Sequence, residues 1–149
     1  QEKAPKSVDN FLQYVKSGFY KGTIFHRVID GFMIQGGGYD AKMQPKRTRK
    51  AIPSESKNGL SNVAYSIAMA RLDNPNSANS QFFINVVDNP GLDFPGKDGH
   101  GYTVFGKVIK GQEVVDKIKK VLVDDRYGFQ DVPVTPVVIT SASVVKAVK

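Results

Sequence analysis

An arginine and a glutamine lie within the otherwise apolar run from Phe25 to Gln35, and they are the most chemically informative side chains of the chain. Alternate residues of a strand point to opposite faces, so Arg27 should share a face with Phe25 and Ile29, while His26 faces the other way. No carboxylate lies nearby at matching parity to neutralise the guanidinium. The pattern therefore predicts that Arg27 points into a binding or catalytic site.

Residue sets typical of metal, nucleophile and cofactor chemistry are missing. The chain has no cysteine, its two histidines are not at metal-ligand spacing, and no serine lies in a G-x-S-x-G pattern. The glycine run 36–38 is not followed by a Lys-Ser/Thr pair, which favours a bend over a phosphate-binding loop. We interpret each histidine as hydrogen-bonded within a strand or loop, and expect no cofactor.

The other candidate site residues are polar or apolar side chains on later strands and loops. Taken one at a time, the apolar ones are typical of a protein core. Arg71 differs, because it follows a short strand that leaves into a loop. The full set of candidates beside Arg27 is Phe32, Met33, Gln35, Ala70, Arg71, Gln81, Phe83, Leu92 and Tyr102.

The elements that must position these residues are mostly short strands. Apolar residues at helical spacing predict a helix over about 6–17 and a second one near 112–119. Short apolar runs bounded by Gly, Pro, Asn and Asp predict strands at 23–28, 32–35, 66–70, 81–86, 102–109 and 137–145. Many strands with two helices indicate a closed or nearly closed antiparallel barrel.

Length and composition fit one globular domain covering residues 1–149, with a formal net charge of +7. A membrane span needs about 18 consecutive apolar residues, and no apolar run in the chain approaches that length, so we expect no membrane span. The densest basic cluster, at 46–50, has no interleaved aromatic residue, and we interpret it as a solvated loop without specific nucleic-acid binding. A nucleic-acid binder resting on charge alone is an alternative that predicts steep salt dependence.

Three sequence blocks together resemble the cyclophilins, a family of peptidyl-prolyl cis-trans isomerases. The blocks are FHRVIDGFMIQGGG, then SIAMAR with NSQFFINV, then GYTVFGKV. The similarity runs from about residue 4 to 145 and is closest to bacterial members. It implies a mainly β fold: an antiparallel eight-stranded barrel capped by two α-helices.

The resemblance also implies roles for individual residues. Arg27 corresponds to the catalytic arginine of the family, and Gln35 and Gln81 to polar groups beside the substrate backbone. Ala70 and Arg71 correspond to the strand end that pairs with the residue before proline. The walls of the proline pocket correspond to Phe32, Met33, Phe83 and Leu92, and Tyr102 occupies a position that is histidine in many eukaryotic members.

The implied function is isomerisation of X-Pro bonds in peptides and folding proteins, by a non-covalent mechanism in which an arginine stabilises the twisted amide. The alternative is a proline-peptide-binding module or chaperone with little catalysis. His26 has no role in this chemistry, since the reaction moves no proton. The resemblance covers both periplasmic and cytoplasmic bacterial members, and the basic charge with the ending at 136–139 favours the periplasm.

The sequence departs from the family pattern in two places. Gly91 occupies a position that the family fills with tryptophan or phenylalanine, which predicts weak or no cyclosporin binding. The chain begins at Gln1, directly before its first helix, so the strand pair that opens other members is expected to be missing from this N-terminally truncated domain.

Overall fold

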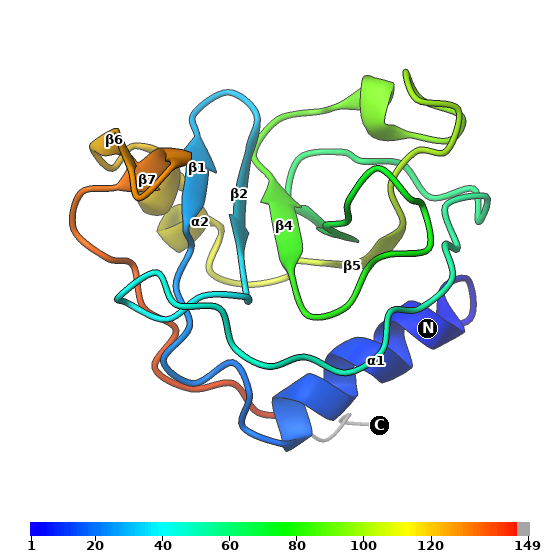
Figure 1. The fold of residues 1–149 in the computed structure, drawn as a ribbon. Coiled ribbons are helices and arrows are strands. Elements are labelled where there is room, and N and C mark those ends of the chain that lie inside the picture. Colours follow the sequence, from blue (N-terminus) through cyan, green and yellow to red (C-terminus); the bar gives the residue numbers. More distant parts are fainter. Residues whose placement is uncertain (146–149) are drawn as a thin grey trace.

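Five antiparallel strands form the main sheet, in the order β1-β2-β4-β3-β5 (Figure 1). A second sheet pairs β6 with β7, and β7 lies beside β1 (Figure 1). This computed structural model describes residues 1–145. The mainly β architecture with two helices is as predicted. The strands are β1 (Arg27–Ile29), β2 (Met33–Gly36), β3 (Ser66–Met69), β4 (Phe82–Asn85), β5 (Val104–Lys107), β6 (Val123–Arg126) and β7 (Phe129–Pro133).

The first predicted strand is shorter than expected, and the last, predicted at 137–145, does not form a regular strand. Strand β1 begins only at Arg27; before it, Thr23 pairs with Asp40 and Ile24 with Val138 through isolated bridges. Around Val138, backbone hydrogen bonds join Phe25 N to Val137 O and Ile139 N to Thr23 O. No regular strand continues to residue 145, because Pro136 precedes this segment and small polar residues follow it.

The β6–β7 hairpin was not expected from the sequence. Its first strand contains Asp124 and Asp125, residue types that are depleted in strands and hide the alternation. Its turn is formed by Tyr127 and Gly128, with φ angles of 54° and 80°. Consecutive positive φ angles are typical of two-residue hairpin loops, so the glycine was the one local signal for this turn.

The two helices agree with the sequence periodicity. Helix α1 (Pro5–Lys16) begins with its proline in the first turn, and α2 (Gln112–Lys119) has the bounds that were predicted. The buried face of α1 also contains polar residues. Ser7 donates from N and Oγ to Glu55 Oε1, at 2.7 and 2.8 Å, and Asn10 Nδ2 donates to the Asn79 carbonyl at 2.7 Å. These bonds attach α1 to two of the long loops.

The alternation of strand residues divides the core into two parts. One face of the sheet contributes the row formed by Val28, Ile34, Ile84 and Ile67 to the larger core, which also receives α1 and α2. The opposite face contributes Met33, Ala68, Phe83 and Val104 to a smaller cluster. Burial of each large apolar side chain stabilises the fold by about 1.5–3 kcal/mol. The smaller cluster forms the floor of the cleft described below.

The basic segment 46–50 is docked onto the end of α1. The Lys46 ammonium donates to the Phe19 carbonyl and lies 4.7 Å from the centroid of its ring. Arg49 Nη1 donates to Gln13 Oε1 at 3.1 Å, and its backbone N–H donates to the Tyr14 hydroxyl at 2.9 Å.

Within residues 1–145, neither helix has the length and apolar character that crossing a membrane requires.

Candidate active site

Register places the chemically informative side chains in one row across the sheet. Arg27 of β1 is paired with Gln35 of β2, Gln35 with Phe83 of β4, and Phe83 with Ala68 of β3. Paired residues of antiparallel strands point to the same face, so the guanidinium, the amide and the aromatic ring share one surface. Arg27 therefore shares a face with Ile29, as predicted, whereas Phe25, which was predicted on the same face, lies in the larger core.

A hydrogen-bond relay connects the polar members of this row. Arg27 Nη1 donates to Gln35 Oε1 over a long 3.4 Å, and Gln35 Nε2 donates to Gln81 Oε1 at 2.9 Å. The glycine run forms the predicted bend beside it, and Gly37 has a φ of 89°. A Cβ on Gly38 would lie 2.6 Å from Gln81 Cγ, so only glycine leaves room for that side chain.

Apolar side chains form the deepest part of a cleft of about 640 Å³. Met33 and Phe83 are buried, and Tyr102 meets Phe83 edge-on, with 5.6 Å between ring centroids. All ten candidate residues from the sequence line this one cleft: Arg27, Phe32, Met33, Gln35, Ala70, Arg71, Gln81, Phe83, Leu92 and Tyr102. The volume lies in the range of small-ligand sites.

The cleft has further walls that sequence reasoning missed. One end is lined by Tyr39 and by residues 128–130 of the unexpected hairpin, and the other by Leu72, Ser77 and Asn79. The hairpin reaches the cleft only because β7 lies beside β1, a long-range contact with no local signal. Leu72 and Ser77 belong to the polar loop that follows Arg71 and could have been suspected from that position.

His26 differs from its sequence-based interpretation. The histidine precedes β1 instead of lying within it, and it lines the cleft beside Tyr39 and Phe129. The ring is buried, and its Nδ1 has no hydrogen-bond partner among residues 1–145. Burial, with a smaller contribution from the Arg27 charge, lowers the pKa of His26 to about 4. The imidazole is therefore neutral at neutral pH.

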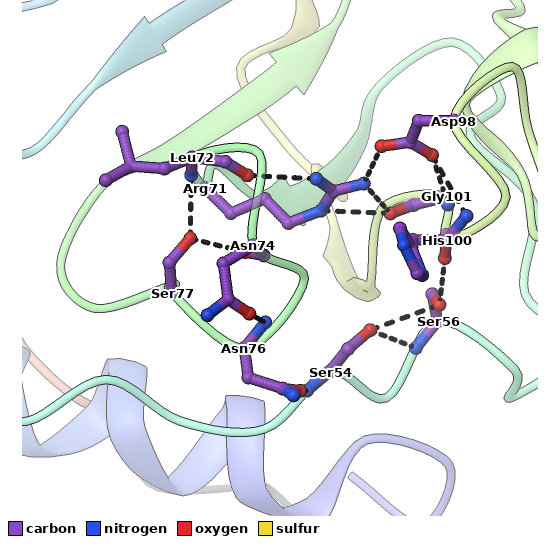
Figure 2. A network of polar contacts seen from close by, with 10 residues as sticks. All are labelled: Ser54, Ser56, Arg71, Leu72, Asn74, Asn76, Ser77, Asp98, His100 and Gly101. Carbon is purple, nitrogen blue, oxygen red and sulfur yellow. Dashed lines mark hydrogen bonds and ion pairs between the residues drawn. The ribbon is translucent and has the colours of Figure 1, made fainter.

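Arg71 also lines the cleft, and most of its guanidinium N–H groups are bonded within the protein (Figure 2). Its Nε and Nη2 donate to the Gly101 carbonyl at 3.1 and 2.6 Å, and Nη1 donates to the Leu72 carbonyl at 3.0 Å. Nη2 also pairs with Asp98 Oδ2 at 2.6 Å, and the guanidinium carbon lies 4.2 Å from the Tyr102 ring centroid. Arg71 thus joins two loops and supports Tyr102.

Asp98 is the acidic partner in this network. Hydrogen bonding from Arg71, followed by the backbone N–H groups of His100 and Gly101, holds the pKa of Asp98 well below its usual range. The His100 carbonyl accepts a hydrogen bond from Ser56 Oγ, which ties a third loop to the same segment (Figure 2). The network positions residues 98–102 against the cleft.

A second polar network positions the wall that contains Leu92. Asn89 Nδ2 donates to the Phe32 carbonyl at 2.9 Å and to Asn85 Oδ1 at 2.8 Å. Asn62 donates from its backbone N to Asp93 Oδ1 at 2.6 Å. The loop between β4 and β5 is therefore attached to the β1–β2 turn, and Phe32 and Leu92 face the same cleft.

Within residues 1–145, no three His, Cys, Asp or Glu side chains are grouped as a metal site would require.

The model of the family described as "Cyclophilin type peptidyl-prolyl cis-trans isomerase/CLD" matches residues 1–144. The chain is 57% identical to peptidyl-prolyl cis-trans isomerase cyp18 of Streptomyces antibioticus over 143 residues, which are 95% of this chain and 86% of the relative. It is 52% identical to peptidyl-prolyl cis-trans isomerase B of Escherichia coli (strain K12) over 145 residues, 96% of this chain and 88% of the relative.

Solved structures show the same fold. The crystal structure of a cyclophilin type peptidyl-prolyl cis-trans isomerase from Cryptosporidium parvum, determined in the presence of the dipeptide Ala-Pro, superposes with a TM-score of 0.78. The match has 28% sequence identity and covers 98% of this chain and 89% of the solved chain. The relatives at higher identity and this structure agree on one enzyme family.

Proposed function

Because this chain belongs to the cyclophilin family and is a peptidyl-prolyl cis-trans isomerase, we propose that the cleft holds X-Pro segments of peptides and folding proteins while Arg27 stabilises the twisted amide. One observation carries the proposal: a guanidinium with a single long hydrogen bond lies at the edge of an apolar pocket. The Ala-Pro dipeptide of the solved relative supports proline peptides as the ligand class.

The reaction requires stabilisation of one conformation, without a nucleophile or an acid. Rotation about an X-Pro bond is slow because it breaks amide resonance, with a barrier of about 18–20 kcal/mol. A catalyst must bind the twisted amide more tightly than either planar form. Each about 1.4 kcal/mol of such selectivity accelerates the reaction about tenfold.

Arg27 suits this task because of what happens at the prolyl nitrogen. As the bond twists, that nitrogen becomes pyramidal and gains a lone pair that can accept a hydrogen bond. A guanidinium stays charged and cannot act as a base, so Arg27 donates in every protonation state of its surroundings. The donor is half-buried and oriented by its contact with Gln35, and a preoriented donor gains more in a water-poor site than it would in bulk water.

The remaining lining residues each contact a different part of the substrate. Phe32, Met33, Phe83 and Leu92 immobilise the proline ring by apolar contact, so that the preceding carbonyl swings while the ring stays in place. Gln35 and Gln81 provide amide groups for the substrate backbone. The strand end at Ala70 and Arg71 receives the residue before proline, through its backbone, because the Arg71 side chain is committed to the 98–101 loop.

The test is exchange spectroscopy on a proline tetrapeptide. NMR measures cis-trans exchange with wild type and with Arg27→Ala, at equal enzyme concentration. We expect exchange broadening with wild type, and its disappearance with Arg27→Ala while the peptide still shifts enzyme resonances in the cleft. Binding shifts with no accelerated exchange by wild type would instead indicate a proline-binding module or chaperone, and equal exchange by both proteins would refute the role of Arg27.

Gly91 supports weak cyclosporin inhibition, since the family's aromatic contact to this ligand is absent at that position. The expected result is that proline-peptide turnover continues at cyclosporin concentrations well above nanomolar. An inhibition titration with a nanomolar midpoint would contradict this expectation. Gly91→Trp is the matched variant and should lower the midpoint.

A further inference from the structure

A second cavity, of about 420 Å³, adjoins the proline cleft. Both cavities are lined by Phe32, Leu92 and Tyr102, so these three side chains form a partition between them. The outer side of the second cavity is formed by the turn η1 (Pro90–Leu92) and by Lys97. The proposed function assigns no role to this space.

Gly91 keeps the cavity open, and the backbone does not require glycine there. Its φ is not positive, and a Cβ built on it would meet only Lys97 Cε, at 3.7 Å. Gly101, also on the cavity wall, is different: its φ is 65° and a Cβ would lie 2.6 Å from Phe94 N. Gly101 is therefore sterically obligatory, whereas a side chain at Gly91 could project into the hollow.

We propose that this cavity is a second subsite, which binds a large apolar or aromatic side chain on the residue that follows proline. The inference rests on the proposed function, because it requires a proline ring in the adjoining cleft. It makes the enzyme selective for Pro-Phe, Pro-Tyr and Pro-Leu sequences over Pro-Ala.

The direction of the substrate follows from the two linings. Ala70 and Arg71, which receive the residue before proline, line only the first cleft, as do Leu72 and Ser77 beyond them. A chain that enters along these residues and places its proline against the partition has only its following residue within reach of Gly91. The second cavity therefore adjoins the site across the Phe32–Leu92–Tyr102 wall.

The chemistry of the lining favours a ring or a branched aliphatic group. The partition residues and Pro90 give apolar contact, and an aromatic side chain can bury a large area against such a surface. Lys97 lies at the rim, where its ammonium could approach the face of a bound ring. Asp88 accepts a hydrogen bond from Ala64 N, and Asp98 pairs with Arg71, so both rim carboxylates already have partners (Figure 2).

The test compares capped peptides that differ only after proline. NMR titration gives the dissociation constants of Ala-Ala-Pro-Phe and Ala-Ala-Pro-Ala for wild type, Gly91→Ala and Gly91→Phe. We expect wild type to bind the Phe peptide about tenfold more tightly, from partial burial of one ring. Gly91→Ala should keep most of this preference, and Gly91→Phe should reduce it to within about twofold by filling the cavity.

Two further readouts separate the possible outcomes. The peptide ring should show nuclear Overhauser contacts to Leu92 and Lys97, and Ala-Phe-Pro-Ala, with its ring before proline, should show none. Equal affinities of wild type for both peptides, or a preference that survives in Gly91→Phe, would overturn the subsite. Exchange of Ala-Ala-Pro-Ala is measured in the same samples. If wild type accelerates this exchange, loss of the subsite leaves the proposed function intact. If wild type does not accelerate it, the proposed function itself is refuted.

Discussion

Two arginines line the same cleft, and their surroundings are opposite. Arg27 extends from the first sheet strand, is half-buried, and makes one long hydrogen bond of 3.4 Å to Gln35. The Arg71 side chain is 4% exposed and donates to two backbone carbonyls and to Asp98. Arg71 therefore has little hydrogen-bonding capacity left for a substrate, whereas most N–H groups of Arg27 remain available.

Under the proposed function, the two arginines serve different purposes within a single site. A catalytic donor must improve its hydrogen bonds when the transition state forms, so it has to begin with weak ones. A structural donor stabilises the fold most when its bonds are already complete, since buried carbonyls without a partner are costly. Substitution of each arginine should therefore change different measurements.

The largest effect is expected from Arg27→Ala. Loss of one preoriented donor to the developing lone pair should lower kcat/KM about 10²–10³-fold. The free energy of unfolding should change by less than about 1 kcal/mol, because the side chain is half-buried and makes one weak bond. A protease-coupled isomerase assay and urea denaturation measure the two quantities.

Arg27→Lys is the matched control, since it keeps the positive charge but loses the planar fork. We expect an activity between those of wild type and Arg27→Ala. Full activity of Arg27→Lys would mean that charge alone suffices, and a large stability loss in either variant would remove the contrast with Arg71.

Arg71→Ala should act mainly on stability. The substitution leaves the Gly101 and Leu72 carbonyls without their donor and removes the support beneath Tyr102, which should lower the free energy of unfolding by about 2–3 kcal/mol. Activity should fall less than in Arg27→Ala, and mostly through KM, because a displaced wall weakens binding of planar and twisted substrate alike. Urea denaturation and separate determination of kcat and KM test this expectation.

Arg71→Lys offers partial rescue, because an ammonium can still pair with Asp98 but cannot bond both carbonyls at once. Its stability should lie between those of wild type and Arg71→Ala. A kcat loss in Arg71→Ala as large as that in Arg27→Ala, with unchanged stability, would show that Arg71 also belongs to the chemistry.

The pKa of His26 depends on the burial of its ring and on the nearby charge of Arg27. Its folded pKa of about 4 lies below the ordinary value, so at mildly acidic pH the unfolded chain binds a proton that the folded chain does not. This contribution to stability is complete above about pH 6.5 and is lost as the pH falls, by about 2 kcal/mol between about pH 7 and about pH 5. Urea denaturation of wild type and His26→Phe should show the difference.

The same histidine distinguishes the two arginines. Arg27→Ala removes a nearby positive charge and should raise the pKa of His26, although burial keeps it below the ordinary value. Arg71→Ala should leave that pKa unchanged. NMR titration of the imidazole resonances measures both, and a shift in the Arg71 variant alone would contradict the assignment.

Asp98→Asn should have the smallest effect. The amide oxygen can still accept from the backbone N–H groups of His100 and Gly101, so the substitution removes the charge and the one oxygen that accepts from Arg71, on a side chain that is 43% exposed. Exposed ion pairs are screened by salt, so the stability difference from wild type should shrink at high ionic strength. Thermal unfolding at low and high salt measures this difference, and a difference that does not change with salt would contradict a contribution from the Asp98 charge.

Local sequence patterns were sufficient for some elements and not for others. The bounds of α2 and the shared face of Arg27 and Ile29 follow from periodicity, which depends on near neighbours only. The β6–β7 hairpin was missed because Asp124 and Asp125 interrupt the alternation in β6. His26 was assigned to the wrong surroundings because parity holds only inside a strand, and β1 begins one residue later.

The candidate cleft was predicted more fully than the fold, because the family resemblance supplied residues that no local pattern connects. Taken one at a time, Phe83 and Leu92 are typical core residues. The family resemblance, carried by three separate sequence blocks, assigned them to the proline pocket. The far walls, formed by Tyr39 and by residues 128–130, had no such motif. Contacts between segments far apart in the chain carry no periodic signal.

By itself, the sequence determined which kinds of chemistry are available: an arginine without a nearby acid, apolar neighbours, and none of the cysteines that thiol chemistry requires. Only the tertiary structure decided which arginine keeps most of its N–H groups available. Arg71 donates to Asp98 and Gly101, which lie 27 and 30 residues further along the chain. Hydrogen-bond saturation depends on segments that folding brings together, whereas residue type and alternation are local properties of the chain.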